Sequence, residues 1–193
     1  MNKRLILLTC FLLSAAICFP LTVSCARAED YVNQEYGIQF AIPAGYQWRT
    51  QETRSVDPDG STKTFLGSCR MELLTEPGGH AGDAVMLLAV FDYPQGHIQE
   101  SLTREDYVKS SVTPQQKIIG GIEKVSVSGF DGVSYVLKET DPQRYGTAMS
   151  LVTLVWLTKR RVLEFTATTL PQEYFDFKLP SFKSALYNLE IKR

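Results

Sequence analysis

The sequence predicts an α+β fold in which an antiparallel sheet is sandwiched between helices, and three observations support this class. Much of the chain after residue 30 alternates apolar with polar residues, which is typical of half-buried strands. Residues 84–91 and 147–157 are apolar at both phases of the alternation, as expected for central strands that are covered on both faces. Near the C-terminus the apolar spacing changes to about 3.6 residues, which indicates a helix that packs on the sheet.

The first half of the chain carries two strand patterns separated by a polar segment. Residues 38–42 alternate apolar and polar side chains, and this run stops at Pro43. Residues 50–64 are polar and contain the turn sequence Asp-Pro-Asp-Gly at residues 57–60. The alternation resumes over residues 65–73, which predicts a second strand.

A helix is predicted after the apolar run at residues 84–91. Thr103 can accept a hydrogen bond from the free amide of Asp106, and the acidic residues that follow Thr103 suit the positive first turn of a helix. Leu102 and Tyr107 are spaced to form a hydrophobic staple across this start. We therefore expect a helix that begins near Thr103 and packs one side on the sheet.

The second half predicts a meander of strands. Residues 125–127 and 133–137 flank the sequence Phe-Asp-Gly at residues 130–132, and Asp-Gly between alternating runs is a strong hairpin signal. The long central strand is expected to turn at Lys159-Arg160 and to return over residues 162–168.

The end of the chain predicts a helix that begins at Pro180, because proline suits the first helical position. A shorter helical turn is expected to open at Pro171. The apolar face of the final helix is predicted to consist of Phe182, Ala185, Leu186 and Leu189.

The first 28 residues are expected to be an export signal. Lys3 and Arg4 provide a positive start, and residues 5–19 form an apolar stretch that is short for a membrane-spanning helix. An Ala-Arg-Ala sequence ends at Ala28 and places small residues where a signal peptidase reads them. We therefore expect cleavage after Ala28 and a single periplasmic or secreted domain over residues 29–193.

The same segment allows a second interpretation. The Thr-Val-Ser-Cys sequence that ends at Cys25 partly matches a bacterial lipoprotein box, in which the cysteine is lipidated and becomes the new N-terminus. The leucine that such a box prefers three places before the cysteine lies one place too early, at Leu21. Soluble export, a lipid anchor on Cys25 in the inner or outer membrane, and an uncleaved leader all stay open, and only the lipid or the leader would bring the protein to a membrane.

Only one of the four cysteines belongs to the expected mature chain. Cys10, Cys18 and Cys25 lie in the leader, so an internal disulfide is not expected after cleavage. The remaining Cys69 shares its strand phase with apolar residues such as Met71, which predicts a buried core thiol rather than a nucleophile.

The charge balance bears on the class of partner. The chain has 193 residues, of which 44% are hydrophobic and 21% are charged, values typical of a globular domain. The 20 basic residues are matched by 21 acidic ones, so no strong uniform field favours nucleic acid. No nucleic-acid partner is therefore expected.

Three segments of the chain together form a pattern that resembles the PsbP/Mog superfamily and its bacterial relatives of unknown function. Residues 31–48 resemble its opening, an extended segment and a glycine followed by an alternating strand and a Pro-x-Gly-x-x-Trp sequence. Residues 129–132 resemble its late hairpin, and residues 182–189 resemble its final helix, with Ala-Leu-Tyr-Asn in place of the usual isoleucine-leucine-x-serine. The matched positions are glycines, prolines and core aromatics, so no set of functional residues carries over.

The resemblance implies a binding role without turnover. The superfamily includes an extrinsic subunit of photosystem II, a Ran-GTPase partner, and bacterial chaperone or adaptor proteins. An export signal makes a nuclear GTPase partner irrelevant to this chain, so the resemblance implies an accessory module with a protein or envelope component as its partner.

Residues that could carry chemistry are few. His80 and His97 are both expected in loops, and they would form a metal site only if those loops met, with Asp83 as a third ligand. Two separated ligands do not define a site, so we expect no metal, no cofactor and no catalytic residues. The alternative is a small metal-dependent hydrolase that uses His80 and His97.

Partner-binding residues are expected among exposed aromatic and basic side chains. Trp48, Tyr93 and Tyr145 lie near predicted strand ends, and Arg160 lies in the only basic run of the chain. Tyrosine and tryptophan are favoured at interface cores, although such residues also serve as ordinary rim packing and such basic runs as solvated turns. The sequence thus predicts an exported, non-catalytic binding module of the bacterial cell envelope.

Overall fold

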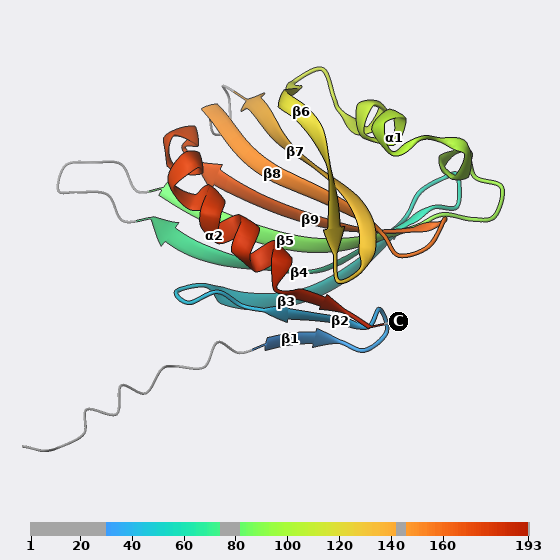
Figure 1. Ribbon diagram of the computed structural model, residues 1–193, viewed down its shortest axis with the longest axis horizontal. Helices are drawn as coiled ribbons and strands as arrows, with labels where there is room; N and C mark the ends of the chain where they lie inside the picture. Colours follow the sequence, from blue (N-terminus) through green and yellow to red (C-terminus); the bar gives the residue numbers. More distant parts are fainter. Residues whose placement is uncertain (1–29, 74–81, 142–145, 193) are drawn as a thin grey trace, which may run out of the picture.

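The structure is a computed structural model that describes residues 30–73, 82–141 and 146–192, and these residues form two antiparallel sheets with two α-helices and two short 3-10 helices (Figure 1). In spatial order, the small sheet consists of β1 (Asp30–Asn33), β2 (Ile38–Ala41) and β10 (Leu189–Ile191). In spatial order, the large sheet consists of β3 (Gln47–Val56), β4 (Thr62–Leu73), β5 (Gly82–Asp92), β9 (Arg161–Leu170), β8 (Gly146–Trp156), β7 (Phe130–Asp141) and β6 (Gln116–Val127). The helices are η1 (Ile98–Ser101), α1 (Arg104–Ser111), η2 (Gln172–Tyr174) and α2 (Phe175–Tyr187).

The main core lies between one face of the large sheet and a layer made of α2 and the small sheet (Figure 1). α2 contributes Phe182 and Leu186, and β2 contributes Ile38 and Phe40, all of them essentially inaccessible to solvent. The ring of Phe40 packs on that of Phe165 from β9, with 6.2 Å between the ring centroids. Burial of each such side chain stabilises the fold by about 1.5–3 kcal/mol.

The opposite face of the large sheet carries a second, smaller cluster that packs under α1. β8 shows the division between the two faces, because Leu151 and Val155 point into the main core whereas Val152 and Leu154 belong to the second cluster. This confirms β8 as a central strand apolar on both faces, and β5 also lies inside the sheet as predicted. α1 supplies Val108, but with eight residues it covers only part of this face.

The expected arrangement of layers holds only in part. The chain is mostly antiparallel sheet with two α-helices, and α1 and α2 lie on opposite faces of the large sheet. The strand expected over residues 38–42 does not join that sheet. It forms a separate small sheet with β1 and β10, because the chain turns sharply at Gly45, which has a φ of +85°, before β3 begins. The small sheet and α2 therefore cover this face of the large sheet together, whereas the sequence predicted that a helix alone would cover it.

The helix starts are correct for α1 and wrong for α2. The side chain of Thr103 accepts a hydrogen bond of 3.1 Å from the amide of Asp106, as predicted. Pro180 lies inside α2 rather than at its first position, because the expected short turn at Pro171 runs through η2 directly into the helix. Leu189 leaves the helix and enters β10, where its side chain is buried.

One strand phase and one turn position differ from prediction. A β-bulge between Phe65 and Gly67 moves Leu66 into the core and leaves Phe65 partly exposed, whereas the predicted inward position of Cys69 is confirmed. The hairpin between β6 and β7 turns at Ser128 and Gly129, which both have positive φ. The expected Asp-Gly turn is wrong, because those two residues pair within the strands.

The outer strand β3 is almost wholly exposed, and the other outer strand, β6, is mostly exposed but buries Val127 and partly buries Val125. Each pairs with its neighbour through a register shift, between Thr50 and Thr53 in β3 and between Ile119 and Glu123 in β6. Bulges of this kind twist an edge away from further strand pairing. No helix in the described ranges has both the length and the apolar character needed to cross a membrane.

Candidate functional site

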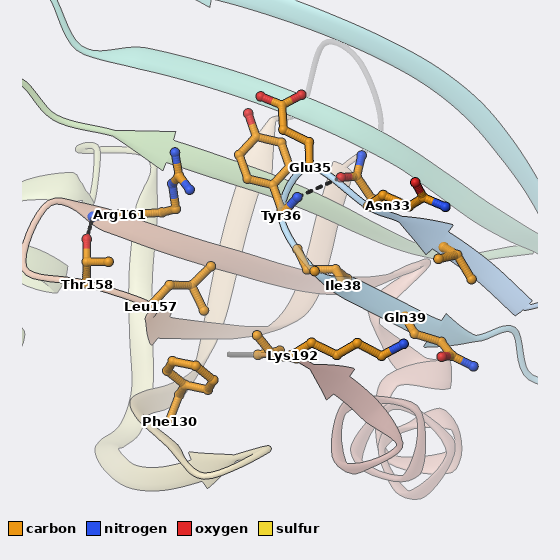
Figure 2. A pocket seen from close by; sticks show the side chains of 14 residues that line it. Asn33, Glu35, Tyr36, Ile38, Gln39, Phe130, Leu157, Thr158, Arg161 and Lys192 are labelled. Atoms are coloured by element: carbon orange, nitrogen blue, oxygen red, sulfur yellow. Dashed lines mark hydrogen bonds between the residues drawn. The ribbon is translucent and has the colours of Figure 1, made fainter.

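A cleft of about 870 Å³ opens at one end of the two sheets, where the turn between β1 and β2 faces the turn between β8 and β9 (Figure 2). We call it the end cleft. Its lining residues are Val32, Asn33, Gln34, Glu35, Tyr36, Gly37, Ile38, Gln39, Phe130, Leu157, Thr158, Arg161, Ile191 and Lys192. The cleft therefore draws on four separate parts of the chain.

Close backbone contact holds one wall of the cleft in place. The amide of Lys192 donates a hydrogen bond of 2.8 Å to the carbonyl oxygen of Gly37. Gly37 has a φ of +65°, and a Cβ atom at this position would lie 2.9 Å from the carbonyl oxygen of Lys192. Only glycine meets both conditions without strain, so this residue lets the β1–β2 turn lie against the end of β10.

Buried polar side chains fix the shape of the β1–β2 turn. The side-chain oxygen of Asn33 accepts a hydrogen bond of 3.0 Å from the amide of Tyr36 (Figure 2). The side-chain nitrogen of Asn33 donates to the carboxylate of Glu52 at 2.7 Å, and the hydroxyl of Tyr31 donates to the same carboxylate at 3.1 Å. Burial, together with the charge of Glu52, raises the pKa of Tyr31 to about 12, so its hydroxyl remains a donor. These bonds tie the turn to β3 of the large sheet.

The floor of the cleft holds a cation beside an aromatic ring. The guanidinium of Arg161 lies 5.1 Å from the ring centroid of Tyr36, and its Nε pairs with the carboxylate of Asp92. The hydroxyl of Thr158 accepts hydrogen bonds from the amides of Arg160 and Arg161, which sets the path of the β8–β9 turn. An arginine that is stacked and paired in this way presents its remaining N–H groups in a fixed direction.

Apolar side chains complete the cleft. Ile38 and Ile191 are buried, Phe130 and Leu157 are partly buried, and Val32 is 53% exposed. With the exposed ammonium of Lys192 at the rim, the cleft combines an apolar wall with two cationic groups. This arrangement suits a ligand with an apolar body and a negative charge.

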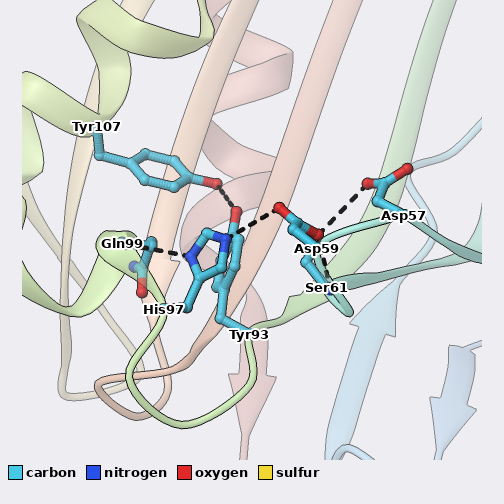
Figure 3. A network of polar contacts seen from close by, with 7 residues as sticks. All are labelled: Asp57, Asp59, Ser61, Tyr93, His97, Gln99 and Tyr107. Carbon is cyan, nitrogen blue, oxygen red and sulfur yellow. Dashed lines mark hydrogen bonds and ion pairs between the residues drawn. The ribbon is translucent and has the colours of Figure 1, made fainter.

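His97 lies away from the cleft, in a network of polar contacts (Figure 3). Its Nδ1 accepts a hydrogen bond of 3.1 Å from the amide of Gln99 at the start of η1, and its Nε2 lies 3.0 Å from the carboxylate of Asp59. A carboxylate only accepts, so Nε2 donates to Asp59 while Nδ1 accepts from the backbone. Both ring nitrogens are thus engaged in linking two loops, and neither presents a lone pair to a metal.

The other proposed metal ligands are not brought together with His97. Asp83 forms a two-point ion pair with Arg70, and His80 lies outside the described residues. In the ranges that the structure covers, no three His, Cys, Asp or Glu side chains are grouped so that they could hold a metal ion. Cys69 is buried, and burial raises its thiol pKa to about 12, which suits a core thiol rather than a nucleophile.

The residues proposed for partner binding are distributed over the molecule. Trp48 packs against Tyr31, with 4.4 Å between ring centroids, so most of its ring belongs to the rim of the main core. Tyr93 is partly buried and its hydroxyl lies 2.6 Å from that of Tyr107. Arg160 is half-exposed and lies 3.6 Å from the carboxylate of Glu100.

The structure does not bear on three more of the residues proposed from the sequence. Cys25, Ala28 and Tyr145 lie outside the described residues. Sequence patterns mark none of the residues that form the end cleft as functional, although Arg161 directly follows the proposed Arg160. The one local signal was the glycine at position 37 before an alternating strand.

No protein-family model and no curated protein sequence matches the chain. Among solved structures, the PsbP protein of Synechocystis sp. PCC 6803 has 13% identity and a TM-score of 0.56, covering 89% of this chain and 96% of its own. LpqN of Mycobacterium tuberculosis, described as involved in cell envelope biogenesis, has 13% identity and a TM-score of 0.43 over 74% and 91% of the two chains. The Ran-binding protein Mog1p of Saccharomyces cerevisiae has 13% identity and a TM-score of 0.35 over 82% and 88%.

The likeness to cyanobacterial PsbP extends over nearly all of both proteins, and it establishes the fold rather than the activity. It agrees with the resemblance that residues 31–48, 129–132 and 182–189 carry. The fold of this chain is therefore similar to that of cyanobacterial PsbP.

Proposed function

We propose that this protein is a non-catalytic binding module of the bacterial cell envelope and that the end cleft holds a segment of a partner protein. The observation that carries the proposal is the composition of the cleft, in which apolar side chains face Arg161 and Lys192 in a hollow of about 870 Å³. A short extended segment with apolar side chains and a carboxylate matches this surface.

The chemistry of the cleft favours binding over turnover. Its described lining residues include no cysteine, histidine or serine, and the only carboxylate among them is the exposed Glu35. The hydroxyl of Thr158 is committed as an acceptor for two backbone amides. Nucleophilic catalysis needs a nucleophile within hydrogen-bond reach of a base, and these side chains offer no such pair.

Export remains part of the proposal because residues 1–28 read as a leader. Cleavage after Ala28 would give a periplasmic or secreted domain that starts at Glu29, whereas lipidation of Cys25 would anchor the protein to a membrane. Mass spectrometry of the protein recovered from cell fractions checks this point. We expect an N-terminus at Glu29, and an acylated Cys25 or an intact Met1 would contradict it.

Photo-crosslinking in cells tests the cleft as the partner site. Val32 lines the cleft and is 53% exposed, and Val56 is a matched control on β3 that is 67% exposed. A photoreactive phenylalanine analogue placed at position 32 should form an adduct with a distinct protein, which mass spectrometry identifies. The same analogue at position 56 should not form that adduct.

A charge reversal tests the role of the cationic rim. Lys192→Glu should weaken the adduct formed from position 32, and Lys183→Glu, which changes an exposed lysine on α2, should not. Equal adducts from positions 32 and 56, or equal effects of the two reversals, would refute the assignment of the end cleft.

A further inference from the structure

A second concave site lies on the other face of the large sheet, between that face and the segment that carries η1 and α1. It is a pocket of about 290 Å³. We call it the tyrosine pocket, because its lining includes Tyr93, Tyr107 and Tyr135 together with Phe91 and Glu164. It shares no lining residue with the end cleft.

The carboxylate in this pocket has no cationic partner among the described residues. Glu164 lies on β9 and is partly buried, and its one hydrogen bond there comes from the hydroxyl of Thr166 at 3.2 Å. A carboxylate in such a setting has acceptor capacity that a single neutral donor leaves unfilled. A ligand that brings donors and positive charge would fill this capacity, so the pocket favours a cation.

Three phenol rings line the same pocket as this carboxylate. The hydroxyls of Tyr93 and Tyr107 lie 2.6 Å apart, and the two rings meet edge to face with centroids 6.2 Å apart. Tyr135 is 6% exposed, and burial followed by the charge of Glu164 raises its pKa to about 12. Burial and the same carboxylate also raise the pKa values of Tyr93 and Tyr107. The phenols are therefore neutral at neutral pH, and the charge in this group of side chains is that of Glu164.

The chain itself places a cation on the aromatic surface beside the pocket. The ammonium of Lys63 lies 4.7 Å from the ring centroid of Phe91, which lines both the tyrosine pocket and the adjoining hollow on the same sheet face. Lys63 lines only the adjoining hollow, whereas Glu164 and Tyr135 line both, and no ion pair joins Lys63 to Glu164 within 4 Å among the described residues. The tyrosine side of the pocket thus has aromatic rings and a carboxylate but no ammonium of its own among the described residues.

The pocket also has hydrogen-bond acceptors that the protein leaves unfilled. Gln99 from η1 lines the pocket and is 5% exposed, and its side-chain oxygen has no hydrogen-bond partner in the part of the chain that the structure describes. Together with Glu164, this gives two acceptors that lack strong donors. A ligand that brings positive charge and N–H or polarised C–H groups complements both.

We propose that the tyrosine pocket binds a small alkylammonium cation, with Glu164 as its counter-ion and Tyr93, Tyr107 and Tyr135 as its aromatic wall. Aromatic rings attract ammonium and quaternary ammonium groups that lie within about 6 Å of the ring centroid. A volume of about 290 Å³ limits the ligand to a small molecule or to one side chain of a larger one. A bare divalent metal fits less well, since the pocket supplies a single carboxylate.

Trp156 provides an internal probe of occupancy. Its ring meets that of Tyr107 edge to face, with centroids 5.6 Å apart. The sequence has two tryptophans, so Trp48→Phe leaves Trp156 as the only one. Titration of this variant with choline should change the Trp156 emission in a saturable manner, and 3,3-dimethylbutan-1-ol, the neutral isostere of choline, should not. Sodium chloride at equal ionic strength controls for salt.

A matched pair of carboxylate variants then tests the counter-ion. Glu164→Gln should weaken choline binding about tenfold, as expected for loss of one charged contact. Glu173→Gln, which removes an exposed carboxylate from η2, should leave binding unchanged. A titration with butylammonium separates a preference for N–H donors from one for quaternary ammonium.

The two comparisons keep the proposal open to refutation even if one variant folds poorly. Equal responses to choline and its neutral isostere, measured on protein that retains Glu164, would overturn it. So would equal binding by folded Glu164→Gln and the starting protein, or no saturable response to either ammonium ligand. None of these results bears on the end cleft, whose test uses other residues.

Discussion

At the residue scale, single atoms decide which segments approach each other. Gly37 lets the β1–β2 turn lie against Lys192, and His97 connects the β3–β4 turn to η1 through two different ring nitrogens. Both residues act on backbone or loop position rather than on a ligand. Their effects should therefore appear in the free energy of unfolding before they appear in binding.

Gly37→Ala should destabilise the fold by more than Gly120→Ala. Both glycines have positive φ, of +65° and +77°, and at such a φ a side chain costs about 1–2 kcal/mol. A Cβ at position 37 would also lie 2.9 Å from a backbone oxygen, whereas a Cβ at position 120 would meet nothing within 4 Å. Urea unfolding of both variants measures the difference. Equal losses in the free energy of unfolding would show that the backbone at Lys192 moves aside at little cost.

Asp59 should make stability depend on pH in the acid range. Hydrogen bonds from the side chain and amide of Ser61, followed by that from His97, lower the pKa of Asp59 to about 2. A lowered folded-state pKa stabilises the fold above the ordinary value of about 4, and this contribution is lost as the pH falls towards 2. The stability gap between the natural protein and Asp59→Asn should therefore shrink between pH 4 and pH 2 in urea titrations. A constant gap would contradict this assignment.

At the element scale, the short helix α1 forms one side of the tyrosine pocket, and its position depends on few contacts. Its start is fixed by Thr103, and its only fully buried side chain is that of Val108. A helix of this length gains little from its own hydrogen bonds, so capping and packing carry its stability.

Thr103→Ala should destabilise the protein by about 1 kcal/mol, because the amide of Asp106 loses its acceptor. Thr103→Asn should retain most of the stability, since asparagine is an equally good N-cap. Thermal unfolding of the two variants provides the comparison, and equal losses would mean that the cap bond contributes little. Hydrogen exchange at Val108 would show whether the change is local to α1.

The elements that sequence patterns predict are those with a buried face. β5 and β8 carry apolar runs, and α1 carries a capping signal, so each was found. β3 and β6 are edge strands that are exposed over most of their length, so the pattern marks only residues 125–127 of β6 and strand pairing defines the rest. The bulge at Phe65 reverses which side chains of β4 point into the core, and no sequence pattern there predicts a bulge.

The two pockets could not be predicted for a related reason. The end cleft joins Tyr36, Phe130, Leu157 and Lys192, and the tyrosine pocket joins Tyr93, Tyr135 and Glu164. No spacing in the sequence relates these positions, because strand order brings them together. Tyr93 was singled out as an exposed aromatic, and its partners became apparent only from the topology.

At the scale of the whole molecule, Cys69 can report opening of the core. It is the only cysteine in residues 29–193, and it is buried in β4 with a pKa raised to about 12. In protein produced as residues 29–193 at pH 8, a thiol reagent should react with it far more slowly than with a free thiol. The rate should rise with urea in parallel with unfolding followed by tryptophan fluorescence. Rapid labelling of the native protein would indicate that the main core opens locally.

The pairing of β10 with β2 has a consequence for the order of folding. Phe40 lies opposite Leu189, which is 149 residues later in the chain, so the small sheet cannot close until almost every residue has left the ribosome. Contacts of such long sequence separation are slow to form. The layer that completes the main core is thus assembled last, and one edge of β2, the strand that carries Ile38 and Phe40, has no strand partner until β10 arrives.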